Sequence, residues 1–274
     1  MISIAASFLT QLAITYESIP TSTARPNIPR TEVFAPKNNR AGSDAFEVVA
    51  NGGFGIKPAI FSGLWANYST VIPALEPVCP TGNCTWPKYQ SVGVCANMSD
   101  VSHLLINDTT VQNGLGRKLP NGAYLDISAT GVNALNITAS GELDTLAFQD
   151  VAPFHVMADI FVIIDYSVGV GNDTRAVELL LSLCRREYNT TVVNGRASTS
   201  AVIVAMTDTD PDPRPSSAYS PAWNFQNIFS GSTSDGMPTT DSAELFAQAA
   251  FQAPKYTANL LAMMTNIATS LTNT

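Results

Sequence analysis

The chain has 274 residues, of which 45% are hydrophobic, so it can bury a sizeable core within one large domain. Its formal net charge is −8 at pH 7, and its basic residues form no stripe, the nearest candidate being Arg185 with Arg186. This composition argues against nucleic acid as a partner, because phosphate groups are bound by clustered Lys and Arg side chains.

The first 45 residues carry no catalytic or binding motif. Residues 1–17 are apolar as far as Ile14, but they lack a basic start and are too short to span a bilayer. A weak signal segment and a buried strand or helix both fit them. Residues 18–45 contain repeated prolines and are predicted to be an extended linker.

Residues 51–57, NGGFGIK, lack the full pattern of a phosphate-binding loop and are predicted to form a turn before a strand.

The densest motif of the chain is residues 79–95, CPTGNCTWPKYQSVGVC. The turn-forming residues between Cys79 and Cys84 bring these two cysteines together, so we predict a short disulfide between them. An extended segment then carries Cys95 away from Cys84, which leaves Cys184 as its partner. The predicted bridges are therefore Cys79–Cys84 and Cys95–Cys184.

A zinc site is the alternative use of these cysteines. It is disfavoured because His103 and His155, the two histidines of the chain, lie in no ligand pattern. Disulfides place the chain in an oxidising compartment. We expect no metal and no cofactor.

Sequons for N-linked glycosylation support the same compartment. They begin at Asn67, Asn83, Asn97, Asn107, Asn136, Asn172 and Asn189. Because all of them lie between residues 67 and 189, this central region is predicted to be the glycosylated, solvent-facing body.

The motif at residues 79–95, followed by Asp100-Val101-Ser102, resembles the signature of a fungal family of membrane proteins described as domain of unknown function 3176. The resemblance extends to residues 188–195, YNTTVVNG, and to residues 267–273, IATSLTN. It implies apolar spans near the N-terminus, an extracytoplasmic domain and a further span near the C-terminus, with no established activity. The chain would then be a truncated member that lacks full membrane spans, with residues 1–17 as the tail of one span.

The chain departs from the family pattern at two positions. Met98 and Leu179 stand where the family usually has cysteines, so the resemblance implies that an apolar contact replaces a second bridge. The resemblance also implies a strand over Val177–Tyr188, although local propensity over residues 175–187 is helical.

The predicted fold class is mainly β (α+β), with an antiparallel sheet core built from residues 119–206. Alternation of apolar and polar residues predicts strands at residues 124–128, 134–138 and 143–148. Residues 160–164, IFVII, are apolar on both faces and predict a central strand, and residues 199–206 are a second candidate.

The end of the chain changes character. Residues 207–241 are rich in proline. Asp208, Asp210 and Asp212 resemble the opening of a calcium-binding loop, but Pro213 stands where such a loop requires glycine. We therefore expect a solvated acidic loop. Trp223, Phe225 and Phe229 are expected to pin this segment onto the sheet.

Helical spacing of apolar residues predicts an amphipathic helical segment over residues 241–274. We expect Asp241 to cap it, Glu244 to complete a capping box and Pro254 to divide it. The predicted organisation is thus residues 1–17, the linker 18–45, a disulfide-stapled glycosylated β-rich domain 46–240 and the helical segment 241–274.

No catalytic constellation is recognisable in the sequence. Asp159 and Asp165 flank the central strand, but their separation of about 20 Å along it is too large for glycoside hydrolysis. We therefore expect a non-enzymatic sensing or interaction module that is membrane-associated or secreted, with its main domain extracytoplasmic and a protein or cell-wall partner. The alternative is a secreted, glycosidase-like hydrolase with an unrecognised carboxylate site.

Overall fold

The computed structural model describes residues 53–66, 76–108, 116–127, 132–139, 144–151, 155–166, 173–204, 228–234, 237–252 and 254–273, together with Ile28 and Ile72. The described chain forms two compact units. The first contains residues 76–89 and 188–201 with Ile28, and the second contains the other described residues. Strand β8, Asp173–Val193, contributes residues to both units.

The second unit is built on an antiparallel sheet, which confirms the predicted fold class. Its centre is β7, Val156–Tyr166, which pairs with β6, Ala134–Ala139, on one side and with β8 on the other. The sheet continues beyond β6 through β10, Gly231–Ser234, and β11, Met237–Pro238, and β2, Tyr89–Asp100, pairs with β8. The predicted central strand at residues 160–164 lies within β7, where every residue from 157 to 166 is buried.

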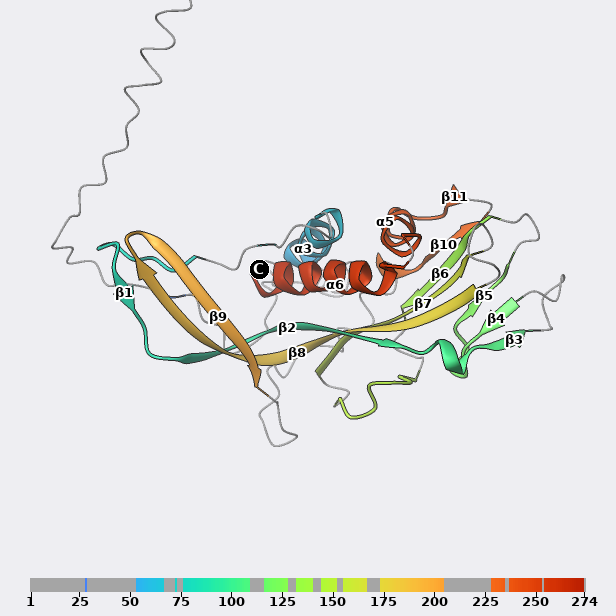
Figure 1. The fold of residues 1–274 in the computed structure, drawn as a ribbon, viewed down its shortest axis with the longest axis horizontal. Coiled ribbons are helices and arrows are strands. Elements are labelled where there is room, and N and C mark those ends of the chain that lie inside the picture. Colours follow the sequence, from blue (N-terminus) through green and yellow to red (C-terminus); the bar gives the residue numbers. More distant parts are fainter. Residues whose placement is uncertain are drawn as a thin grey trace, which may run out of the picture. The chain divides into compact units, whose positions relative to one another are not determined.

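Three helices cover one face of this sheet, α3, Gly53–Trp65, α5, Asp241–Ala250, and α6, Tyr256–Thr272 (Figure 1). The larger hydrophobic core lies between the helices and alternate residues of β6, β7 and β8. Helix α3 approaches α6 closely at Gly63, where an added Cβ would lie 2.4 Å from the Cα of Ile267. Only glycine allows the two backbones to come this close.

The opposite face of the sheet carries a smaller core. Its cover includes a short antiparallel sheet of β3, Ile106–Asp108, β4, Gly116–Lys118, and β5, Tyr124–Leu125, and a 3-10 turn, η1, Ser102–Leu104. Leu119 and Leu125 pack there against Phe161 and Ile163 of β7. In the part of the chain that the structure describes, this face is therefore covered by short strands and a 3-10 turn and by no α-helix.

The first unit is a small β structure. β1, Cys84–Thr85, pairs antiparallel with the end of β8, and β9, Arg196–Val204, follows β8 through a tight turn and pairs with it. The turn residues Asn194 and Gly195 have φ values of 52° and 73°, which suit an Asn-Gly hairpin turn. Tyr89 stacks on Tyr188 with ring centroids 5.3 Å apart.

Both predicted disulfides are present. Cys79–Cys84 lies in the first unit with a Cα separation of 6.0 Å, and Cys95–Cys184 joins β2 to β8 in the second with a separation of 5.8 Å. Leu179 is fully buried in the larger core, and Met98 packs against that core. Direct contact between these two side chains remains a prediction.

The C-terminal helical segment divides at Pro254 as predicted, into α5 and α6. The predicted cap was wrong, because Thr240 rather than Asp241 is the N-cap residue, and its hydroxyl accepts from the backbone N–H of Ala243. Glu244 therefore lies four residues after the cap and not three, so the predicted capping box is wrong as well. Phe229 is buried in the larger core, where it makes an edge contact with Phe246.

Three other predictions are corrected by the structure. Residues 53–57 begin helix α3 instead of forming a turn before a strand. Residues 144–148 are not a strand, because their backbone N–H groups bind a side chain of β8 instead of a neighbouring strand. Residues 199–204 do form part of a strand, β9, but its residues 196–203 are exposed, so it is not a central strand.

Some predictions fall outside the described residues, namely the segment 1–17, nearly all of the linker 18–45, the acidic loop at residues 208–212, Trp223 and Phe225. Within the described part of the chain, no helix is both long enough and apolar enough to cross a membrane.

Candidate functional site

The most unusual feature of the second unit is a pair of buried acidic side chains on neighbouring strands. In the β7–β8 register, Phe161 lies opposite Glu178, and Asp159 lies two residues from Phe161 on the same side of its strand. Asp159 and Glu178 are therefore diagonal neighbours, and diagonal side chains on one face of a sheet are within reach of each other. Phe161 belongs to the smaller core, so the pair lies on the face opposite the helices.

Glu178 is fully buried and has several hydrogen-bond donors. The hydroxyl of Thr145 donates to its Oε1, and the backbone N–H groups of Leu146 and Ala147 donate to its Oε2 at 3.1 and 2.7 Å. The Thr145 hydroxyl also accepts from the backbone N–H of Phe148. One carboxylate thus holds the irregular segment 144–148 against the sheet.

Asp159 is also buried, but it has a different environment. Its Oδ1 has no hydrogen-bond partner among the described residues. Burial, followed by the charge of Glu178 and a hydrogen bond with it, raises the pKa of Asp159 to about 8, although a backbone hydrogen bond at Ile160 opposes the shift. At neutral pH Asp159 is therefore mostly protonated.

Two neighbouring carboxyl groups can act as acid and base in hydrolysis. They can equally serve as a structural anchor, because a buried carboxylate is an effective acceptor for backbone N–H groups. The donors of segment 144–148 occupy Glu178, and both side chains are buried. In this conformation the pair is closed to a substrate.

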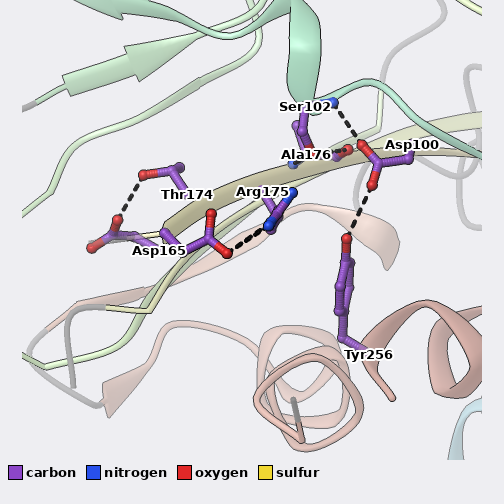
Figure 2. A network of polar contacts seen from close by, with 8 residues as sticks. Asp100, Ser102, Asp165, Thr174, Arg175, Ala176 and Tyr256 are labelled. Carbon is purple, nitrogen blue, oxygen red and sulfur yellow. Dashed lines mark hydrogen bonds and ion pairs between the residues drawn. The ribbon is translucent and has the colours of Figure 1, made fainter. Parts of the chain in front are cut away.

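A second polar cluster lies where β2 ends and β8 and α6 begin (Figure 2). Asp100 accepts from the backbone N–H of Ser102 at 2.9 Å and from the hydroxyl of Tyr256 at 3.1 Å. Arg175 makes an ion pair with Asp173 at 2.7 Å. This cluster fastens the start of α6 to the end of β2.

The same cluster shifts several pKa values. Burial, and then the charge of Asp100 and its hydrogen bond, raises the pKa of Tyr256 to about 12. For Asp100 partial burial is the largest single influence and opposes the shift, but hydrogen bonds from Ser102 and Tyr256 together outweigh it and lower the pKa. Tyr166 contacts Tyr256 edge to face and donates to the carbonyl of Ala250, and burial raises its pKa.

The predicted site residues occupy different parts of the structure. Cys79, Cys84, Cys95 and Cys184 form the two bridges. The sequon asparagines Asn83, Asn97, Asn107 and Asn189 are exposed, Asn136 is half-buried in β6, and Asn67 and Asn172 lie outside the described residues. Within the described ranges, no three His, Cys, Asp or Glu side chains are grouped so that they could hold a metal ion.

Glu178 is not among the residues that the sequence predicted for a site. The carboxylate pair recognised in the sequence was Asp159 with Asp165, but Asp165 lies near the far end of β7 and accepts from the hydroxyl of Thr174 at 2.7 Å. The available signal was a single charged residue within the apolar run AVELLLSL, residues 176–183, since a charge in a fully buried strand requires partners.

No family model, no curated protein and no solved structure matches this chain. Membership of the fungal family that residues 79–95 resemble therefore remains a prediction.

Proposed function

We propose that the chain is the extracytoplasmic domain of a membrane-associated or secreted protein of the fungal family that it resembles. It acts as a non-enzymatic sensing or interaction module that binds a protein or a cell-wall polymer. Two kinds of observation support this proposal, the covalent bridges and the use of the acidic side chains.

The observation that carries the proposal is the Cys95–Cys184 bridge. Both cysteines are buried, and they join two strands of the main sheet that are far apart in sequence. A bridge built into the core in this way belongs to a protein that folds where disulfides form and persist.

The buried carboxyl pair supports the non-enzymatic part of the proposal. The carboxylate oxygens of Glu178 accept from the hydroxyl of Thr145 and from the backbone N–H groups of Leu146 and Ala147. A catalytic carboxylate needs an open side toward its substrate. Here the available sides of Glu178 are used to hold a loop.

Location is tested with a tagged copy of the protein in fungal cells. We expect protease added to intact cells to reach the tag, glycosidase treatment to increase the mobility of the protein, and non-reducing peptide maps to contain both bridges. A reduced protein that is protected from protease in intact cells would overturn the proposal. Binding is tested by sedimentation of the purified, oxidised protein with isolated cell walls, with its reduced and alkylated form as control.

A secreted hydrolase is the second candidate, and the raised pKa of Asp159 beside Glu178 is the observation that favours it. It requires segment 144–148 to move aside. Screening of the purified protein on glycoside and peptide substrates tests this candidate, with Asp159→Asn as control. Turnover that disappears in Asp159→Asn while the fold persists would establish the hydrolase and overturn the interaction module.

A further inference from the structure

The described sequons differ in what the side-chain amide of the asparagine does. N-linked glycosylation modifies the amide nitrogen, Nδ2, so a modified asparagine keeps only one hydrogen on that atom and needs open space around it. Exposure and the hydrogen bonds of Nδ2 therefore separate asparagines that can carry a glycan in the folded protein from those that cannot.

Four sequon asparagines are compatible with a glycan. Asn83, Asn97, Asn107 and Asn189 are exposed, and the Nδ2 atom of each donates to no other described residue. In β2, Ala96 and Met98 pack against the larger core. Because side chains alternate along a strand, Asn97 between them points away from that core.

Asn136 is the exception. It is half-buried in β6, a strand with neighbours on both sides, β7 and β10. Its Nδ2 donates to the carbonyl of Tyr124 at 2.5 Å and to the hydroxyl of Thr138 at 3.2 Å. A sugar on this nitrogen would leave it one hydrogen, so at least one of these two bonds would be lost, and the sugar would have to fit into a half-buried position between β6 and Tyr124 of β5.

Asn83 combines two roles on one amide group. Its Oδ1 accepts from the backbone N–H of Asn194 at 3.0 Å, next to the bond from the Gly195 N–H to the Gly82 carbonyl at 2.8 Å. These bonds hold the loop of the Cys79–Cys84 bridge against the β8–β9 turn. Glycosylation does not modify Oδ1, so a glycan on Nδ2 leaves the hydrogen bond from the Asn194 N–H in place.

We infer that Asn83, Asn97, Asn107 and Asn189 carry N-linked glycans in the folded protein and that Asn136 does not. In each transfer, Nδ2 attacks the first sugar carbon of a lipid-pyrophosphate-linked oligosaccharide. The new C–N bond replaces the C–O bond to the pyrophosphate, which leaves with the lipid, and Nδ2 loses one proton. The inference rests on the proposed extracytoplasmic location, because the donor is present only on the secretory route.

The test routes the full chain through the secretory pathway of a eukaryotic host by means of an added signal peptide. The folded, oxidised protein is treated with peptide N-glycosidase in ¹⁸O-labelled water, which converts each occupied Asn to a labelled Asp, and the peptides are mapped by mass spectrometry. We expect label at Asn83, Asn97, Asn107 and Asn189 and none at Asn136. Label at Asn136 in the folded fraction, or its absence from any of the other four, overturns the inference.

Variants at the Asn83 sequon separate the two roles of its asparagine. Thr85→Ala destroys the sequon but leaves the Asn83 side chain, so we expect the loss of one glycan with little change in Tm. Asn83→Ala removes both the glycan and the acceptor for Asn194, so its Tm should fall further. Asn136→Gln should leave the number of glycans unchanged, and the loss of a glycan in this variant contradicts the inference.

Failure of this inference is distinguishable from failure of the proposed location. If the rerouted protein has the expected pattern but the protein from its own cells carries no glycan and is reduced, the location is wrong and the assignment of sites stands. If the native protein is exported and bridged but the pattern differs, the assignment is wrong and the location stands.

Discussion

The two faces of the main sheet are covered in different ways, and the side chains on each face reflect the cover. Toward the helices, β8 presents Leu179, Leu181 and Leu183, all in the larger core. Toward the other face the same strand presents Ala176 and Glu178. A helix satisfies its own backbone hydrogen bonds and needs only an apolar surface to pack on, whereas an irregular segment brings backbone N–H groups that need acceptors.

The cover on the face opposite the helices explains why a charged residue is buried in β8. Segment 144–148 makes no strand ladder, and Glu178 supplies the acceptors that a neighbouring strand would otherwise provide. Glu178 is thus buried in β8 because segment 144–148, which covers this face, needs hydrogen-bond acceptors. We expect the two faces to respond to different kinds of substitution, the helical face to volume and the opposite face to charge.

The largest expected effect is on the sheet that both faces share. Replacing Cys95 and Cys184 together by alanine should lower the free energy of unfolding by about 4–5 kcal/mol, because the bridge closes a sequence separation of 89 residues. Denaturant unfolding measures this loss. The matched control replaces Cys79 and Cys84, whose separation is 5, and should cost about 2 kcal/mol. Equal losses would contradict the loop-entropy argument.

On the helical face, Gly63→Ala should lower the free energy of unfolding by about 3 kcal/mol. The added Cβ meets backbone atoms of Asn266 and Ile267, which cannot turn aside as a flexible side chain can. The neighbouring exposed residue provides the control, since Ser62→Ala should change stability by less than about 0.5 kcal/mol. A stability equal to that of the parent protein would mean that α3 does not pack closely on α6.

On the opposite face, Glu178→Gln keeps the volume but removes the charge. We expect the free energy of unfolding to fall by about 2 kcal/mol. Hydrogen bonds to a neutral acceptor replace those to a charged one, and the NH₂ end of the amide faces backbone N–H donors. Hydrogen exchange at Leu146 and Ala147 should accelerate in this variant, since their N–H groups donate to Glu178. The control is Glu244→Gln on the exposed side of α5, expected to stay within about 0.5 kcal/mol. Unchanged exchange at residues 146 and 147 would show that Glu178 does not hold the segment.

The helical face was the more predictable of the two. Local patterns are sufficient for β7, whose apolar run at residues 160–164 has no polar face, and for the division of the C-terminal helices at Pro254. Helix α3 was missed because it contains glycines and Pro58, residues of low helix propensity, and is stabilised by its contact with α6. Tertiary contacts of this kind leave no trace in local periodicity.

The opposite face was less predictable because its structure depends on partners distant in sequence. Residues 143–148 alternate like a strand, yet their N–H groups bind a carboxylate about 30 residues further along the chain. Pairing Asp159 with Glu178 requires the β7–β8 register, which no local pattern supplies. By contrast, the disulfides were predictable, because the turn between Cys79 and Cys84 leaves each remaining cysteine one partner.

The acid pair also predicts how stability depends on pH. Since the folded pKa of Asp159 is about 8, above its ordinary value of 3.8, the folded state binds one proton more than the unfolded state between these values. The free energy of unfolding should therefore fall as pH rises through this window, by at most about 1.4 kcal/mol per pH unit from this group. Urea unfolding at intervals from pH 4 to pH 8 measures the slope.

Asp159→Asn is the control for that slope, because its amide does not titrate. Its stability should depend less on pH than that of the parent protein, with the difference concentrated between pH 4 and pH 8. Identical slopes for the two proteins would mean that Asp159 does not hold a proton in the folded state.

The smallest expected effect is in the polar cluster of Figure 2. Tyr256→Phe removes the hydroxyl that donates to Asp100 and should cost about 0.5 kcal/mol, since solvent replaces much of a bond near the surface. The folded pKa of Asp100 is lowered, so this contribution is present above the ordinary carboxyl pKa and is lost as pH falls through the folded value. The difference between Tyr256→Phe and the parent protein should therefore shrink in acid, opposite in direction to the Asp159 effect. Tyr124→Phe, at an exposed tyrosine, is the control and should show no such trend. A Tyr256→Phe difference that is constant down to pH 2 would mean that the hydroxyl does not depend on the charge of Asp100.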